Sequence, residues 1–208
     1  MIRLAFRLAS AALSLAVVLV LVGFGFIWFD GSRIVDRANA AGWFMPAPAD
    51  APLTVFETTA SKAMFGETWD EKGLPCRTAA RFWFNYTSKP DRHGLSISQV
   101  VARDISYEVE ASQSLSSQTR QLSVACLLDG RFNDTELLRF WLRRVNFGDG
   151  LIGLEPASQS IFNKAPSLLD QAESAKLIAL VYEPLLRSQP DRWEQRAGVI
   201  RQRAAAAN

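Results

Sequence analysis

An uncharged stretch of 22 residues near the N-terminus constrains the fold more than any other feature of the sequence. It covers Leu8–Phe29 and reads LASAALSLAVVLVLVGFGFIWF. A helix of this length rises about 33 Å at ~1.5 Å per residue, enough to cross a hydrocarbon core of ~30 Å. It lacks the polar stripe of an amphipathic core helix, and Trp28 stands where interfacial aromatic residues are expected. The sequence therefore predicts a transmembrane helix over residues 8–29.

A cleavable signal peptide is the alternative interpretation of this stretch. Such a peptide has an apolar region of roughly 7–15 residues, followed closely by a small-x-small cleavage site. Ala38-Asn39-Ala40 has suitable residues but lies well beyond Phe29, which favours an uncleaved anchor. Two arginines flank each end, so the positive-inside rule selects no orientation. The free α-amino group slightly favours a cytoplasmic N-terminus.

The rest of the chain is expected to form one domain behind a spacer. Met45–Pro52 contains three prolines, which disfavour a helix and favour extended backbone. About 150 residues follow, enough for one hydrophobic core. The predicted segments are a short cytoplasmic N-terminus (1–7), the anchor (8–29), a Pro-rich linker (30–52), the domain (53–203) and a tail (204–208).

The composition excludes several classes of function. The 23 basic residues are balanced by 21 acidic ones, so no broad nucleic-acid footprint is present and no nucleic-acid partner is expected. One histidine and two cysteines leave too few ligands for a zinc ribbon or a haem attachment motif, and no metal site is predicted. Cys76 and Cys126 either form a disulfide in an oxidising compartment or are two buried thiols.

The domain has a mainly helical pattern. In Asn133–Val145 the apolar residues share one face and the arginines take the other. Glu136, three residues after Asn133, completes a capping-box signature. Residues 53–57 are a candidate for a short extended segment. Further helices are expected over 96–110, from a second capping box at 167–170 to the Glu183-Pro184 pair, and over 190–203.

A glycine turn before a predicted helix is the strongest local candidate for a binding site. The segment His93–Gln99 reads HGLSISQ. Backbone N–H groups at such a helix start, with the hydroxyls of Ser96 and Ser98, can hold a phosphate or another anion, and Arg103 adds a positive charge. The alternative is an ordinary Ser-capped helix. His93, beside a glycine, is interpreted as a loop residue rather than as a catalytic base.

The order and spacing of several motifs resemble the peptidoglycan glycosyltransferases of glycosyltransferase family 51. His93–Val100 is similar to the family motif G-G-S-T-I-T-Q-Q, and Arg103 falls on the lysine that follows it. Glu136–Gly150 resembles the block E-I-L-E-x-Y-L-N-x-x-x-F-G-x-G. Residues 171–179 and 190–203 resemble the family's L-A-E-A-A-x-L-A helix and its terminal N-P-x-x-A-x-x-R-x-x-V-L stretch.

The resemblance implies a mainly α, lysozyme-like glycosyltransferase domain behind a single N-terminal transmembrane helix. It implies a periplasmic domain on the inner membrane and lipid II or nascent glycan as the ligand. In this family one glutamate accepts the proton of the attacking sugar hydroxyl. Cationic side chains, a second glutamate and sometimes a divalent cation stabilise the leaving diphosphate. On this sequence the resemblance implies that donor phosphate contacts Ser96, Ser98, Gln99 and Arg103.

The residues that carry catalysis in the family are where this sequence departs from it. The first glutamate belongs to an E-D-x-x-F-x-x-H-x-G motif that is absent here. Glu57, which follows Leu-Thr-Val-Phe, is the nearest candidate for the catalytic base, and Glu67 is the second candidate. The alternative for Glu57 is a surface or capping carboxylate.

The family motif R-K-x-x-E falls on Ser117–Gln121, so that Gln121 stands at the second glutamate. Glutamine keeps hydrogen bonding to the substrate but carries no charge and holds a cation poorly. Placing Arg120 on the family arginine instead leaves Val124 at the glutamate, and Arg143 replaces a family asparagine. The sequence thus predicts a lipid II-binding relative with impaired catalysis. The alternative is a non-catalytic, membrane-anchored adaptor for other cell-wall synthesis proteins.

Overall fold

The computed structural model describes residues 2–45, 51–66, 69, 95–109 and 115–207. These residues form helices and turns, with one isolated antiparallel bridge between Asn146 and Ile152 among them. The mainly α fold expected from the sequence is confirmed. The elements are α1 (Ile2–Ala40), α2 (Val55–Ala60), the π-helix η1 (Ser61–Phe65), α4 (Ile97–Val109), α5 (Leu115–Asp129), α6 (Asp134–Leu142), α7 (Leu154–Phe162), the 3₁₀ helices η3 (Pro166–Leu168) and η4 (Pro184–Ser188), α8 (Gln171–Tyr182) and α9 (Pro190–Ala206).

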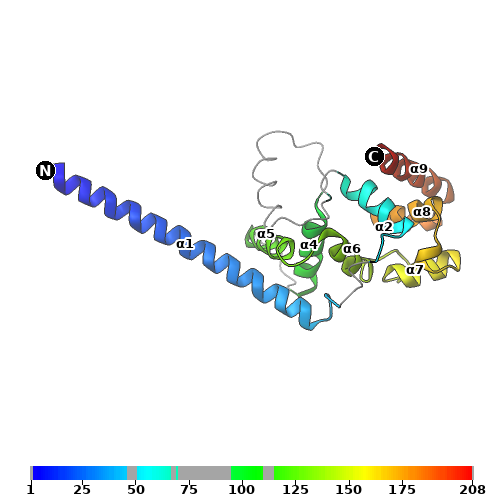
Figure 1. Cartoon of the computed structure of the whole chain (residues 1–208), viewed down its shortest axis with the longest axis horizontal. Helices are drawn as coiled ribbons and strands as arrows, with labels where there is room; N and C mark the ends of the chain where they lie inside the picture. Colours follow the sequence, from blue (N-terminus) through cyan, green and yellow to red (C-terminus); the bar gives the residue numbers. More distant parts are fainter. Residues whose placement is uncertain (1, 46–50, 67–68, 70–94, 110–114, 208) are drawn as a thin grey trace.

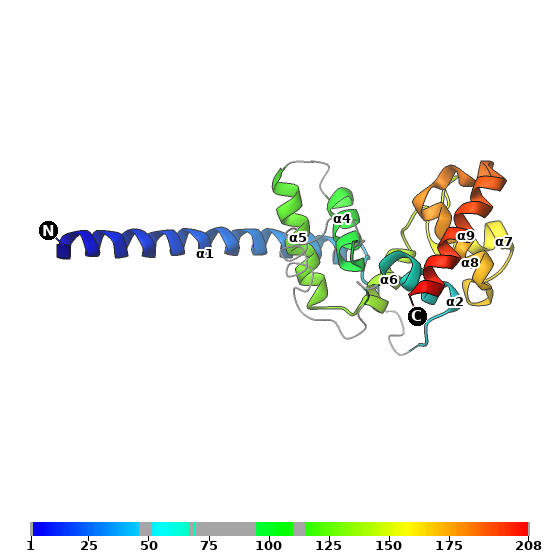
Figure 2. The ribbon, with the colours of Figure 1, turned by 90° about the horizontal axis from the view of Figure 1, so that it is seen from above.

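The helices form two groups with α6 between them (Figure 1). The first group, here called the anchor lobe, consists of α4, α5 and the C-terminal part of α1, which pack on one another. The second, the far lobe, consists of α2, η1, α7, η3, α8, η4 and α9. Figure 2 shows the far lobe on the side of the anchor lobe away from the N-terminus. A site in the anchor lobe therefore lies closer to the apolar part of α1 than a site in the far lobe does.

Helix α1 projects from the anchor lobe as a single long rod (Figures 1 and 2). Its segment Leu13–Ala40 is the one helix of the described residues that is long and apolar enough to cross a membrane. Large apolar side chains along its outer part are exposed, among them Leu13, Leu21 and Phe26. This placement suits a helix whose outer part is covered by lipid and fits the predicted anchor.

The structure differs from the linker predicted over residues 30–52, because α1 continues to Ala40. Ile34, Val35 and Ala38 are at most 1% exposed and belong to the hydrophobic core, and Trp43 is also buried. Ile34, Val35 and Ala38 lie on one face of α1 between charged residues. The prolines that indicate a spacer all lie after this segment, in Met45–Pro52, and the apolar face of residues 34–38 packs in the core.

Gly31 allows α1 and α5 to approach each other closely. A Cβ atom at this position would lie 2.3 Å from Ser123 Oγ. We expect Gly31→Ala to lower the free energy of unfolding by about 1–3 kcal/mol, because the added methyl group overpacks the contact. Gly25→Ala is the matched control, since nothing lies within 4 Å of its added Cβ. Equal denaturation midpoints for the two variants would contradict this account of the helix contact.

The short extended segment predicted over residues 53–57 is wrong, since α2 begins there. Thr54 has extended backbone and caps the helix. The Thr54 backbone N–H donates to Glu57 Oε2 at 2.8 Å, and the Glu57 N–H donates to Thr54 Oγ1 at 3.2 Å. This reciprocal capping box satisfies N–H groups that an isolated helix start leaves free. The local capping pair outweighs the extended preference of the apolar residues before Glu57.

The other helix boundaries follow their caps. The capping box of Asn133 and Glu136 is confirmed at the start of α6. The second box is formed by Asp170 and Glu173 rather than within residues 167–170. Helix α8 ends at Tyr182, before the Glu183-Pro184 pair, as expected. Helix α9 continues to Ala206 with Ala204 buried, so it extends into the residues predicted as a tail.

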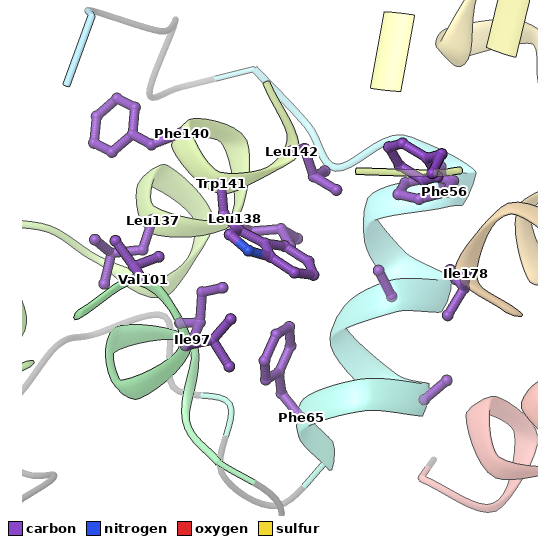
Figure 3. Close-up of a cluster of buried hydrophobic side chains, with 14 of the residues drawn as sticks. Phe56, Phe65, Ile97, Val101, Leu137, Leu138, Phe140, Trp141, Leu142 and Ile178 are labelled. Atoms are coloured by element: carbon purple, nitrogen blue, oxygen red, sulfur yellow. The ribbon is translucent and has the colours of Figure 1, made fainter. Parts of the chain in front are cut away.

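Aromatic and aliphatic side chains join the two lobes through α6. In Figure 3, Trp141 of α6 lies close to Ile97 of α4 and to Phe65 at the end of η1. The Phe65 and Trp141 rings meet edge to face with centroids 6.4 Å apart. Trp141 is 3% exposed and Ile97 is fully buried. The start of α4 is thereby packed against a rigid core.

Candidate functional site

A cavity of about 460 Å³ lies between α4 and α5 in the anchor lobe. The structure brings three predicted ligand-binding residues together in its wall: Gln99 and Arg103 from α4 and Gln121 from α5. Gln99 and Arg103 are four positions apart, which places them on one face of the helix. The other described lining residues are Leu95, Gln118, Thr119 and Leu122.

Ser96 and Ser98 are not among the lining residues. They are 3% and 0% exposed, and their hydroxyl oxygens lie 2.9 Å apart. The Ser96 N–H donates to Gln99 Oε1 at 2.9 Å, and the Gln99 N–H donates to Ser96 Oγ at 3.3 Å. The geometry thus fits the Ser-capped helix, the alternative interpretation of this segment. Gln99 both caps the start of α4 and forms part of the cavity wall. His93 and Gly94 lie outside the described residues.

Arg103 carries the only charge among the described residues that line this cavity. Its side chain is 43% exposed, and its Nε–H donates to Asp104 Oδ1 at 3.0 Å. The other oxygen of Asp104 accepts a hydrogen bond from the Trp141 indole N–H at 2.9 Å. An exposed guanidinium beside amide side chains is suited to binding an anionic group.

The described cavity wall does not fit a divalent cation. Magnesium and calcium bind preferentially to carboxylate oxygens, whereas this wall offers amides, a hydroxyl and a guanidinium. Gln121 stands where the resemblance places the second glutamate. Within the described ranges, no group of three histidine, cysteine or acidic side chains is placed to hold a metal ion. No step is therefore assigned to a metal here.

Glu57 forms a buried ion pair with Arg139 of α6. Arg139 Nε donates to Glu57 Oε1 at 2.7 Å, and Nη2 donates to Oε2 at 3.4 Å. The two side chains are 9% and 10% exposed. Burial alone would raise the pKa of Glu57, but hydrogen bonds from Arg139 and the Thr54 backbone, with the charge of Arg139, hold it below its ordinary value. The carboxylate is thus ionised, caps the start of α2 and is paired with Arg139.

The structure does not bring Glu57 together with Arg103. Glu57 lines a different pocket of about 430 Å³, whose wall includes Arg139, Arg143 and Glu155. A general base needs a pKa near the working pH and must reach the hydroxyl that it deprotonates. Glu57 has a lowered pKa and lies in another pocket. Its environment matches the capping carboxylate that the sequence left as the alternative, and Glu67 lies outside the described residues.

Asp104, Trp141 and Arg139 are residues whose roles the sequence reasoning missed. For Arg139 a signal was available, because it occupies the last position of the family's E-I-L-E block, where the family has a glutamate. An arginine in place of an acid indicates a new acidic partner, here Glu57. For Asp104 and Trp141, no local pattern indicates that residues on two helices share a hydrogen bond.

The cavity lies close to the point where α1 leaves its apolar stretch. Asp30 follows that stretch directly and forms an ion pair with Arg120 of α5, the residue next to Gln121. Cys126, further along α5, is 6% exposed and disulfide-bonded. The other cysteine of the chain, Cys76, lies outside the described residues. The Asp30–Arg120 ion pair therefore connects the α5 wall of the cavity to the C-terminal end of the apolar stretch of α1.

Comparisons with known proteins agree with this architecture. A family model described as Transglycosylase matches residues 67–205. Penicillin-binding protein 1C of Escherichia coli (strain K12) is 31% identical over 135 residues, which are 64% of this chain and 17% of that protein. The biosynthetic peptidoglycan transglycosylase of Pasteurella multocida (strain Pm70) is 28% identical over 102 residues, 49% of this chain and 41% of that protein.

A second biosynthetic peptidoglycan transglycosylase, from Citrobacter koseri, is 40% identical over 58 residues, 28% of this chain and 24% of that protein. The chain thus spans less than half the length of each of these relatives. The family match begins at Glu67 and leaves out Glu57. Since the family model covers most of the chain and the described domain is helical, the chain belongs to the transglycosylase family of peptidoglycan synthesis, with a lysozyme-like domain behind an N-terminal apolar helix.

Proposed function

We propose that this protein binds the diphosphate-sugar headgroup of lipid II at the membrane surface and that its glycosyl transfer is impaired. The observation that carries the proposal is the α4–α5 cavity. Its described wall combines one arginine with three glutamines and contains no carboxylate. Such a wall attracts an anion and donates hydrogen bonds to it, but lacks the second acid that the family's chemistry uses.

The position of the cavity supports a ligand that is anchored in the bilayer. The ion pair between Asp30 and Arg120 ties the α5 wall to the end of the apolar stretch of α1. Leu95 and Leu122 add apolar surface to the wall. A diphosphate held close to the bilayer can reach Arg103 while its lipid chain stays in the membrane. Following the family resemblance, we place the N-terminus in the cytoplasm and the domain on the periplasmic face of the inner membrane.

Impaired transfer follows from the groups that stabilise the leaving diphosphate. Gln121 replaces a carboxylate, and the described wall does not fit a divalent cation. Removing one well-placed electrostatic group costs ~10²–10³ in rate. Losses within one catalytic unit are not additive, so several changes do not simply multiply. We therefore expect polymerisation at least about 100-fold below that of a family member with both glutamates.

For any residual transfer we propose Glu67, rather than Glu57, as the general base. The family match begins at Glu67, while Glu57 lies outside the match and is ion-paired. The described neighbours of Glu67 also support this choice. Phe65 and Trp69 pack with ring centroids 6.0 Å apart, and Phe65 contacts Trp141 near the start of α4. Phe65, two positions before Glu67 in the sequence, thus belongs to the core against which the start of α4 packs.

The proposal predicts that Arg103→Ala weakens lipid II binding at least about tenfold, since a hydrogen bond to a charged group contributes about 1.5–3 kcal/mol. The measurement is equilibrium binding of labelled lipid II to the full chain in nanodiscs. Arg187→Ala is the matched control, because Arg187 is an exposed arginine of similar accessibility, 38% against 43%, in the far lobe. Equal affinities for the Arg103→Ala and Arg187→Ala variants would refute the assignment of this cavity.

The second candidate function is the adaptor. It is favoured by large apolar side chains that the far lobe exposes: Ile152, Leu168 and Leu185 are 60%, 70% and 72% exposed. Apolar surface of this kind is used in protein–protein contacts when it forms a continuous patch. Failure of the folded protein to bind lipid II would favour an adaptor over a lipid II-binding protein.

A further inference from the structure

We propose that Asp104 and Trp141 are positioning residues that hold the Arg103 guanidinium for an anion in the α4–α5 cavity. This inference rests on the proposed function, since it concerns the residue assigned there to the diphosphate. Neither Asp104 nor Trp141 is among the described lining residues. Both act through Arg103, and neither is assigned a contact with the ligand.

The two oxygens of the Asp104 carboxylate accept hydrogen bonds from different elements. Oδ1 accepts from Arg103 Nε at 3.0 Å, and Oδ2 accepts from the Trp141 indole N–H at 2.9 Å. Trp141 is 3% exposed and packs against Phe65 in the core that joins the lobes. The carboxylate thereby connects a partly exposed arginine to a buried side chain of the core.

Helix geometry explains why this connection is needed. Adjacent residues of an α-helix do not face each other, so an Arg–Asp pair at neighbouring positions is not ordered by the helix itself. Asp104 is 31% exposed and would otherwise be free to turn toward water. The indole N–H fixes the carboxylate, and the carboxylate then orients the Nε edge of Arg103. The remaining guanidinium N–H groups of Arg103 are left to bind the ligand.

An ordered guanidinium binds an anion more tightly than a mobile guanidinium does. Immobilising a long side chain on binding costs conformational entropy, and a residue that is already held in place avoids most of that cost. Arg103 is 43% exposed, so without a tether its side chain would sample many rotamers. We therefore expect the hydrogen bonds to Asp104 to increase anion affinity by pre-organising Arg103.

Coulombic repulsion and pre-organisation predict changes of opposite sign in the lipid II affinity when Asp104 is replaced by alanine. Asp104 is a negative charge close to an anion-binding arginine, so by charge alone Asp104→Ala would strengthen lipid II binding. If Asp104 orients Arg103, the same substitution weakens binding despite the removed repulsion. The sign of the change in Kd therefore separates a positioning role from a purely electrostatic one.

The test measures binding of labelled lipid II to the full chain in nanodiscs, for the unmodified protein, Asp104→Ala and Trp141→Phe. We expect Kd to rise about three- to tenfold for Asp104→Ala and about two- to fivefold for Trp141→Phe, which keeps an aromatic ring but lacks the N–H. Glu108→Gln is the matched control, because it removes an acid of the same helix that pairs with Arg144. Tighter or unchanged binding by Asp104→Ala would overturn the proposal.

A second measurement tests the positioning without lipid II. In arginine-labelled protein, hydrogen exchange of the Arg103 Nε–H should be slow in the unmodified chain and faster by at least about tenfold in Asp104→Ala and Trp141→Phe. Unchanged exchange in both variants would refute the tether, whatever the lipid binding shows. Slow exchange in the unmodified chain without any lipid II binding would instead refute the proposed function and leave the tether supported.

Discussion

Replacing Arg139 by alanine is expected to lower the free energy of unfolding by about 3–5 kcal/mol, the cost of leaving a buried carboxylate without its partner. The Glu57 side chain is 9% exposed. Arg139 Nη2 also donates to the backbone oxygen of Ala51 at 2.8 Å. Denaturant unfolding of the full chain in detergent, followed by circular dichroism, measures the effect.

Two further variants separate the buried charge from a general loss of contacts. The double variant Glu57→Gln with Arg139→Met removes both charges, and we expect it to be more stable than Arg139→Ala. Arg187→Ala breaks an exposed ion pair with Asp149 and should cost less than about 1 kcal/mol. If Arg139→Ala lowers the free energy of unfolding no more than Arg187→Ala does, the structural role of the Glu57–Arg139 pair is contradicted.

Capping boxes between residues close in sequence set several helix boundaries, and the sequence predicted some of them correctly. Asn133 and Glu136 are three positions apart, and their capping box starts α6 as expected. Thr54 and Glu57 have the same spacing, but the apolar residues between and before them suggested an extended segment. The capping geometry decides the local structure there, as it does at the start of α6.

The role of Glu57 was harder to predict, because its partner is 82 positions away in the sequence. Nothing close to Glu57 in the sequence indicates a buried arginine. The ion pair joins α2 to α6, and the carboxylate belongs to the wall of a pocket other than that of Arg103. The apolar stretch before Glu57 in the sequence does not indicate this packing.

The cavity itself was partly predictable. Gln99 and Arg103 share a helix face, so their proximity follows from spacing alone. Gln121 was placed beside them only by the motif register of the family resemblance. Ser96 and Ser98 were predicted as ligands from their hydroxyls, but they are buried and hydrogen-bonded to each other. Side-chain direction at a helix start depends on the core beneath it, which the sequence pattern does not specify.

The second large effect concerns glycan polymerisation. We expect the protein to polymerise lipid II at least about 100-fold more slowly than a relative that has both glutamates, by analogy with the ~10²–10³ loss for one electrostatic group. The physical reason is that Gln121 cannot balance or coordinate charge at the leaving diphosphate. Binding is expected to persist, because Arg103 and the amide groups of the cavity remain.

The most direct test of the central claim measures binding and polymerisation in the same sample. The full chain in nanodiscs is incubated with labelled lipid II and magnesium, bound lipid is quantified at equilibrium, and glycan polymer is then separated on a gel. The account predicts saturable binding with polymer at least about 100-fold below that of an active relative under the same conditions. Polymer formed at the rate of the active relative would contradict it.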